Sequence, residues 1–264
     1  MSDEVYLRRA LAALGPYARE VTIVGAWAHR LFERHPLAQP LGHDVLMTED
    51  ADLATPERLA VVGDPIPKRL EDAGFEPRLG GVDSLPVMKF VARDSDGFYV
   101  EFIAPLVGSA TDRSGEPRRI VEIAGATAQL LRHVELLRFE PWEIVLGDGT
   151  LALVANPASY LVQKLLTRRE GAGREKLGKD LLYVHDTLQM FGAQLHALRP
   201  QGARVLAQLH PKHAAKFRNG IGLAIETQSA VAAEIAASTG RPAPPSSAAI
   251  AATCRVGLAA IFGP

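Results

Sequence analysis

Residues 48–53 set two aspartates into a stretch that otherwise alternates like a strand, and they read Thr48-Glu49-Asp50-Ala51-Asp52-Leu53. Aspartate has a low propensity for strands, so its repetition here needs a reason. Alternate side chains of an extended strand share a face, which places Asp50 and Asp52 about 6–7 Å apart on the same side, with Thr48 on that side and Glu49 on the other. Two carboxylates at this spacing can bind one or two divalent cations. An acidic strand end without a ligand is the simpler alternative.

The segment before this one predicts a strand, a glycine and a helix. Val21–Val24 is β-branched throughout and indicates a strand that ends at Gly25. Residues 26–32 have helical spacing, and the helix should end at His35-Pro36, because proline disfavours helical geometry in the residue before it. We expect Trp27 to pack in the core beside the glycine turn.

A third carboxylate, Glu101, lies in the apolar strand predicted for residues 98–104. An acid in such a strand is costly unless its face opens to water or the charge has a partner, and a metal ion would be such a partner. The alternative is an edge-strand glutamate that faces solvent, with Tyr99 and Ile103 on the same face. Residues 87–92 should pair with this strand as a β-hairpin, since Asp96-Gly97 ends the turn between them.

The remaining patterns predict an α+β fold. Helices are expected at 5–14 and 67–73, a strand at 44–53, and a second hairpin at 143–146 and 151–154, so the sheet should be small and mixed. After Asn156-Pro157, a typical helix start, only helical patterns follow. They cover 157–169, 174–191, 201–209 and 221–238, with a last alanine-rich helix after a linker at 242–247. We therefore predict an α/β domain over 1–155 and an all-helical domain over 156–264.

Charge is distributed unequally between these halves. The chain has 264 residues, 47% of them hydrophobic, and a net charge of −1, which excludes a protein that coats nucleic acid or membrane with its whole surface. Residues 1–155 have 16 basic and 24 acidic residues, whereas 156–264 have 13 and 6. A basic helical half is suited to phosphate. Mutual attraction of two domains is the alternative explanation.

The single cysteine, Cys254, excludes an intramolecular disulfide, a cysteine zinc site and an iron–sulfur cluster. The amino terminus lacks the apolar core of a signal peptide, and no stretch approaches the roughly 20 apolar residues of a membrane span. We expect a cytoplasmic protein that does not interact with membranes.

Together these motifs resemble the minimal nucleotidyltransferases of the polymerase-β-like superfamily, in particular the branch that includes abortive-infection nucleotidyltransferase-like toxins. In that family a strand runs into Gly-Gly or Gly-Ser at a helix start, a T-x-D-x-D strand follows, and a later strand carries a third carboxylate. The helical half is also similar: it contains Gln163-Lys164-Leu165, Arg168-Arg169 and Lys179-Asp180. The resemblance covers about residues 20 to 190. Two residues depart from the family pattern, because Ala26 replaces the second Gly or Ser and Glu101 replaces an aspartate.

The resemblance implies an enzyme that uses Mg²⁺ or Mn²⁺ to move a nucleoside monophosphate from an NTP to a hydroxyl of a small molecule, RNA or protein. It also allows an antitoxin partner or a homo-oligomer. The implied metal ligands and catalytic residues are Asp50, Asp52 and Glu101; the implied nucleotide-binding residues are Gly25, Ala26, Thr48, Lys164, Arg169, Lys179 and Asp180.

The helical part of that site has competing explanations. Lys164 points away from the apolar face of its helix, where it could reach the triphosphate or simply be solvated. Asp180 could orient Lys164 or Arg169, or form an ordinary pair with Lys176. A different class of function also fits the basic half: a non-catalytic nucleotide- or nucleic-acid-binding module of toxin or regulatory type.

Overall fold

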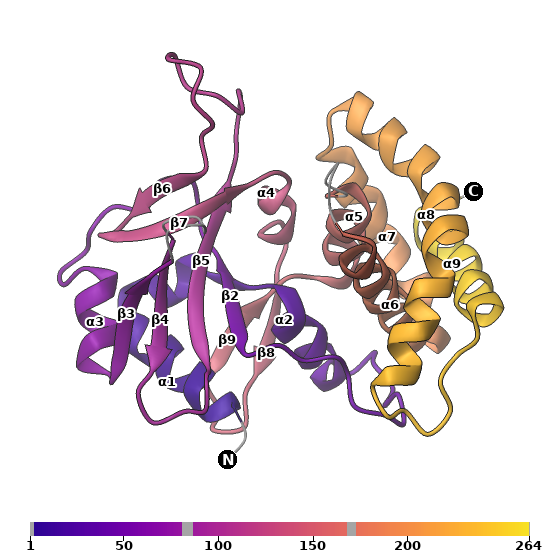
Figure 1. The fold of residues 1–264 in the computed structure, drawn as a ribbon, viewed down its shortest axis with the longest axis horizontal. Helices are drawn as coiled ribbons and strands as arrows, with labels where there is room; N and C mark the ends of the chain where they lie inside the picture. Colours follow the sequence, from indigo (N-terminus) through magenta and orange to yellow (C-terminus); the bar gives the residue numbers. More distant parts are fainter. Residues whose placement is uncertain (1–2, 81–86, 168–172, 264) are drawn as a thin grey trace. The chain divides into compact units, whose positions relative to one another are not determined.

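The computed structural model describes residues 3–80, 87–167 and 173–263 (Figure 1). By packing, the chain divides into two compact units: Met1–Ala28 with Met47–Ala155, and His29–Leu46 with Asn156–Pro264. The first unit is a mixed α/β structure and the second is helical, which confirms the predicted α+β class.

The first unit is built on one mixed sheet with the strand order β3-β4-β5-β2-β1-β9-β8, and with β7 and β6 attached through β5. β2 pairs in parallel with β5, β1 with β9, and β5 with β7; the other pairs are antiparallel. The strands are β1 (Thr22–Ile23), β2 (Asp50–Ala54), β3 (Phe75–Leu79), β4 (Met88–Ala92), β5 (Tyr99–Pro105), β6 (Ile120–Ile123), β7 (Ala126–Leu131), β8 (Trp142–Val145) and β9 (Leu151–Val154). Both predicted hairpins, β4–β5 and β8–β9, are present.

Side chains along β2 alternate between the buried core and the opposite face of the sheet. Ala51 and Leu53 are fully buried, while Asp50 and Asp52 are only half-buried on the opposite face. The short helices of this unit are α1 (Glu4–Leu14), α3 (Ile66–Asp72) and α4 (Val134–Leu137), and α2 (Gly25–Leu31) begins in it. Trp27 is fully buried, as predicted, with its ring edge-on to Phe98.

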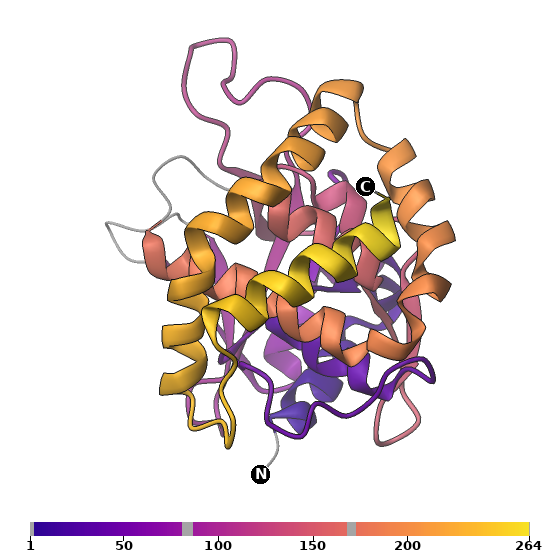
Figure 2. The ribbon, with the colours of Figure 1, turned by 90° about the vertical axis from the view of Figure 1, so that its right-hand side faces the viewer.

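The second unit packs its helices through small residues. Its main helices are α5 (Pro157–Leu166), α6 (Arg174–Met190), α7 (Leu195–Ala207), α8 (Pro211–Ser238) and α9 (Ser247–Phe262), and Figure 2 shows α9 lying across its neighbours. α6 packs on α8 and α9. A Cβ at Gly178 of α6 would overlap Val231 of α8, and one at Gly257 of α9 would overlap Leu188. These glycines permit the close helix approach. Asn156 caps α5, accepting from the Ser159 N–H at 2.8 Å.

Several predicted boundaries are wrong. The strand predicted over 44–53 begins at Asp50, because its partner β5 begins only at Tyr99. The helices predicted to begin at 201 and 221 begin at Leu195 and Pro211. Helix packing stabilises α7 despite Pro200 in its interior, and α8 despite its two glycines. The helix predicted over 157–169 ends at Leu166, and Arg169 lies outside the described residues. β3, β6 and β7 were not expected from the sequence.

The second unit buries several ionisable groups, among them Asp186 and His29. The Asp186 carboxylate accepts from Arg241 Nη1 at 2.9 Å and lies 2.9 Å from His185 Nδ1. Although burial alone would raise its pKa, these partners lower the pKa of Asp186 to about 2. His29 is fully buried with its ring stacked on Tyr160, and burial lowers its pKa to about 4. The charged form is therefore stabilised at Asp186 and disfavoured at His29.

Among the helices of the described residues, none combines the length and the apolar character needed to cross a membrane.

Candidate active site

The site in the first unit begins with the parallel pairing of β2 and β5. In this register Asp50 lies opposite Tyr99, and Asp52 opposite Glu101. One carboxylate oxygen from each of Asp50, Asp52 and Glu101 lies within 4.8 Å of the others. Among the described residues, this is the one group of three or more His, Cys, Asp or Glu side chains placed to hold a metal ion. The structure thus brings together the three carboxylates that the sequence analysis selected.

Glu101 is not the solvent-facing edge glutamate of the alternative explanation. β5 lies inside the sheet, with β2 on one side and β4 and then β7 on the other. Burial of the carboxyl group raises the pKa of Glu101; Lys89 acts in the opposite direction, and the charge of Asp50 adds to the rise. A half-buried carboxyl group with a raised pKa is typical of catalytic sites.

The glycine turn after β1 contacts this carboxylate group. Gly25 has φ +63°, a backbone conformation that residues other than glycine rarely adopt. A Cβ added there would also overlap the Asp52 carboxylate. The Val24 N–H donates to the Asp52 carbonyl at 3.0 Å, which joins the turn to β2. Gly25 is therefore needed both for its backbone angle and for its closeness to Asp52. Ala26, which follows it at the start of α2, is buried.

Thr48 does not share the strand face of the two aspartates. It lies before β2, is exposed, and its hydroxyl donates to the Asp50 carbonyl at 3.4 Å. Strand alternation predicts Thr48 beside Asp50 and Asp52, but the strand pairing extends no further than the hydrogen bond from the Tyr99 N–H to the Glu49 carbonyl, at 3.2 Å, so Thr48 lies outside the strand.

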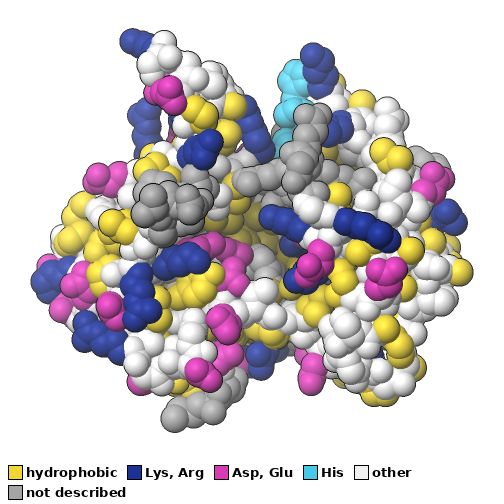
Figure 3. Space-filling model, in the orientation of Figure 1, with side chains coloured by type: hydrophobic (Ala, Val, Ile, Leu, Met, Phe, Trp, Pro, Cys, Tyr) yellow, Lys and Arg dark blue, Asp and Glu magenta, His cyan; other side chains and the backbone are white. Residues whose placement is uncertain are grey.

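The sequence analysis missed Lys89 of β4. Lys89 lies opposite Glu101 in the antiparallel register, and its Nζ donates to the Tyr99 hydroxyl at 3.1 Å. In Figure 3 acidic side chains gather over β2 and β5, with Lys and Arg side chains beside them over β3 and β4. The predicted hairpin could have indicated this neighbour of Glu101, because pairing Val91 with Tyr99 across the turn places Lys89 opposite Glu101.

The second unit brings Lys164 and Asp180 together. Lys164 Nζ donates to Asp180 Oδ1 at 2.7 Å and lies 4.8 Å from the centre of the Tyr183 ring. The two side chains are 16% and 19% exposed, so Lys164 is not a solvated surface lysine. Among the partners considered for Asp180, the structure places Lys164 against it. Lys179 instead pairs at the surface with Glu175, at 2.8 Å.

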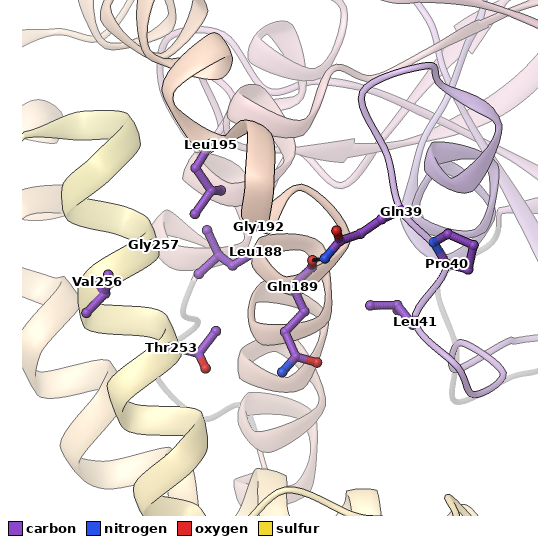
Figure 4. A pocket seen from close by; sticks show the side chains of 10 residues that line it. All are labelled: Gln39, Pro40, Leu41, Leu188, Gln189, Gly192, Leu195, Thr253, Val256 and Gly257. Carbon is purple, nitrogen blue, oxygen red and sulfur yellow. Dashed lines mark hydrogen bonds between the residues drawn. The ribbon is translucent and has the colours of Figure 1, made fainter.

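A hollow of about 500 Å³ in the second unit offers different chemistry (Figure 4). It lies between residues 39–41, the end of α6 and α9, and the Gln39 side chain donates to the Gln189 carbonyl there at 3.0 Å. The residues that line it are Gln39, Pro40, Leu41, Leu188, Gln189, Gly192, Leu195, Thr253, Val256 and Gly257. None of these lining residues is ionisable, so their side chains provide no carboxylate, imidazole or thiolate ligand and no acid–base group.

Comparison with known proteins agrees with the carboxylate site. A family model described as nucleotidyltransferase matches residues 3–204, which include the three carboxylates and the Lys164–Asp180 pair. No curated protein matches the chain. Because the family model covers well over half of the sequence, the chain belongs to the nucleotidyltransferase family.

Proposed function

We propose that the protein transfers a nucleoside monophosphate from an NTP to a hydroxyl group, in a reaction that depends on Mg²⁺ or Mn²⁺. The observation that carries the proposal is the convergence of Asp50, Asp52 and Glu101 within 4.8 Å on two neighbouring strands, in a chain of the nucleotidyltransferase family. Membership of the branch of abortive-infection toxins, and with it an antitoxin or a second copy of the chain as partner, is proposed from the sequence motifs alone.

The donor set fits a hard divalent cation. All three groups are carboxylates, and oxygen ligands of this kind suit Mg²⁺ and Mn²⁺ rather than metals that prefer sulfur or imidazole. Asp50 and Asp52 would hold such ions, with Glu101 completing the set. Bound there, two divalent ions would offset the charge of the triphosphate and stabilise the attacking and leaving oxygens.

Glu101 is the residue that we assign to accept the proton of the attacking hydroxyl. It lies opposite Asp52 in the pairing of β2 with β5, and one of its oxygens lies within 4.8 Å of both aspartate carboxylates. The hydroxyl oxygen forms a bond to the α-phosphorus of the NTP, its proton passes to Glu101, and the bond to the bridging oxygen breaks to release pyrophosphate. Atoms and charge balance without a further reactant.

Each unit has its own candidate groups for binding phosphate. The backbone N–H groups at Gly25 and Ala26 are candidates because the turn at Gly25 borders Asp52, and Thr48 lies two residues before Asp50. Lys164 is the candidate cation of the helical unit, since Asp180 and Tyr183 hold its ammonium group in place. Arg169 remains a prediction.

Two conservative variants test the proposal. Asp50→Asn and Asp52→Asn keep the size of the side chain but remove its charge, and we expect each to lower Mg²⁺-dependent transfer from labelled NTPs at least 100-fold. Asp72→Asn, at an exposed position of α3, is the matched control and should leave transfer unchanged. Full transfer by either site variant would refute the mechanism. Tight NTP binding without pyrophosphate release, across several acceptors, would favour the non-catalytic binding module.

A further inference from the structure

Four charged side chains cross one face of the sheet in a row. Arg78 of β3 pairs with Lys89 of β4, Lys89 pairs with Glu101 of β5, and Glu101 pairs with Asp52 of β2. Directly paired residues of neighbouring strands point to the same face. The row therefore has two cations followed by two carboxylates, and Figure 3 shows basic side chains beside acidic ones over these strands.

The basic end of the row opens into a hollow of about 510 Å³, which we call the β4–β5 hollow. Arg78, Lys89, Tyr99, Glu101 and Gln129 are among the residues that line it. Gln129 of β7 pairs with Ile103, two residues beyond Glu101, and so shares the face of the row. A hollow of this volume can hold a ligand of a few dozen atoms. It presents cations at one side and a metal-site carboxylate at the other.

The position of Arg78 indicates what the cations are for. A single lysine beside Glu101 could be explained as a partner for the carboxylates. Arg78 is one strand further from the carboxylates, its side chain is 59% exposed, and it pairs at 3.0 Å with Glu76 on its own strand. Lys89, and not Arg78, is the direct neighbour of Glu101 in the row, so Arg78 has no carboxylate of the metal site directly opposite it, and arginine and lysine are the usual partners of phosphate.

We propose that the β4–β5 hollow binds the acceptor, and that the acceptor carries a phosphate near the hydroxyl that reacts. Lys89 and Arg78 bind the phosphate, which points the hydroxyl at Glu101. This inference rests on the proposed nucleotidyl transfer and names its acceptor class. The cations also have a physical task, because an acceptor phosphate would otherwise be repelled by the carboxylates and by the triphosphate. A free sugar phosphate and the terminal nucleotide of a nucleic acid share this chemistry.

Direct binding, measured by calorimetry without NTP or metal, tests the acceptor class. We expect ribose 5-phosphate or the dinucleotide CpA to bind at least tenfold more tightly than ribose. Binding of ribose 5-phosphate assigns the hollow to free sugar phosphates, whereas binding of CpA alone assigns it to the end of a nucleic acid. Equal, weak binding of all three compounds would overturn the inference.

Variants then locate the binding. Lys89→Met and the exposed Arg78→Met should each raise the Kd of the bound phosphate compound at least tenfold, and Lys89→Arg should retain most of the affinity. Lys68→Met is the control, since Lys68 is an exposed lysine paired with Asp72 on α3. Unchanged affinity in both methionine variants would show that the phosphate binds elsewhere.

Kinetics separate the two proposals. If Asp52→Asn abolishes transfer but Lys89→Met leaves the KM of the acceptor unchanged, the acceptor inference fails and the transfer reaction stands. If the wild type binds the phosphate compound in the hollow but transfers nothing to any acceptor, the proposed function fails and the binding site stands.

Discussion

The buried imidazole of His29 should make the helical unit sensitive to mild acid. His29 is 0% exposed, its ring lies against Phe32, Tyr160 and Tyr183, and neither ring nitrogen has a hydrogen-bond partner among the described residues. Burial lowers its pKa to about 4, whereas an unfolded chain has the ordinary histidine value near 6.5. Between these values the unfolded state binds more protons, so stability is present above the unfolded pKa and is lost as the pH falls from about 6.5 to about 4.

The size of the effect follows from the shift. Lowering the pKa of His29 from 6.5 to about 4 corresponds to about 3.4 kcal/mol of the free energy of unfolding when both states are fully protonated. About 2 kcal/mol of this stability is already lost at pH 5. Asp186 adds little in this range, because its carboxylate titrates only at lower pH. We therefore expect the free energy of unfolding to drop by about 2 kcal/mol between pH 8 and pH 5 because of His29 alone.

The assay compares the wild type with His29→Phe by urea unfolding, followed through the helical circular dichroism signal at pH 8 and pH 5. Phenylalanine keeps a planar apolar ring but cannot be protonated, so the variant should lack the 2 kcal/mol drop. His196→Phe, at an exposed position of α7, is the matched control and should behave like the wild type. If His29→Phe shows the same pH dependence as the wild type, the assignment of the acid sensitivity to His29 is refuted.

Two further substitutions probe the turn at the carboxylates and the buried ion pair. Gly25→Ala should abolish transfer, because the added Cβ overlaps Asp52, whereas Gly74→Ala, also at positive φ but with open space around it, should cost about 1 kcal/mol of stability and leave transfer intact in the same assay. Arg241→Met should lower the free energy of unfolding by about 3–5 kcal/mol, since it leaves the Asp186 charge buried without its main partner. Arg255→Met, exposed on α9, should change it little, and equal urea midpoints for the two arginine variants would contradict this account.

Local sequence patterns predicted the helices and strands that are determined by residues close together in the sequence. The hairpin of β4 and β5 follows from two apolar strands and the Asp96-Gly97 turn, and the start of α5 follows from Asn156 with a proline after it. The placement of Asp50 and Asp52 on one face of the sheet follows from the alternation of side chains within β2. Each of these features is set by residues fewer than about a dozen positions apart.

Other elements became visible only through partners distant in sequence. β7 forms its parallel ladder on β5, and β2 starts where β5 starts, so neither boundary is encoded in its own segment. Thr48 illustrates the consequence. Thr48 is an even number of residues from Asp50 and Asp52, but a strand needs a partner to extend, and none lies beside residues 44–48 among the described parts of the sheet.

The sequence by itself determined which residues could do chemistry: two aspartates on one strand face, a third carboxylate in an apolar strand, and a lysine and an aspartate on successive helices. Only the tertiary structure decided that Glu101 lies in a central strand opposite Asp52, that Lys164 pairs with Asp180, and that Lys89 and Arg78 continue the row. The physical reason is that periodicity reports the face of a single element, whereas strand register and burial depend on long-range packing that no local pattern specifies.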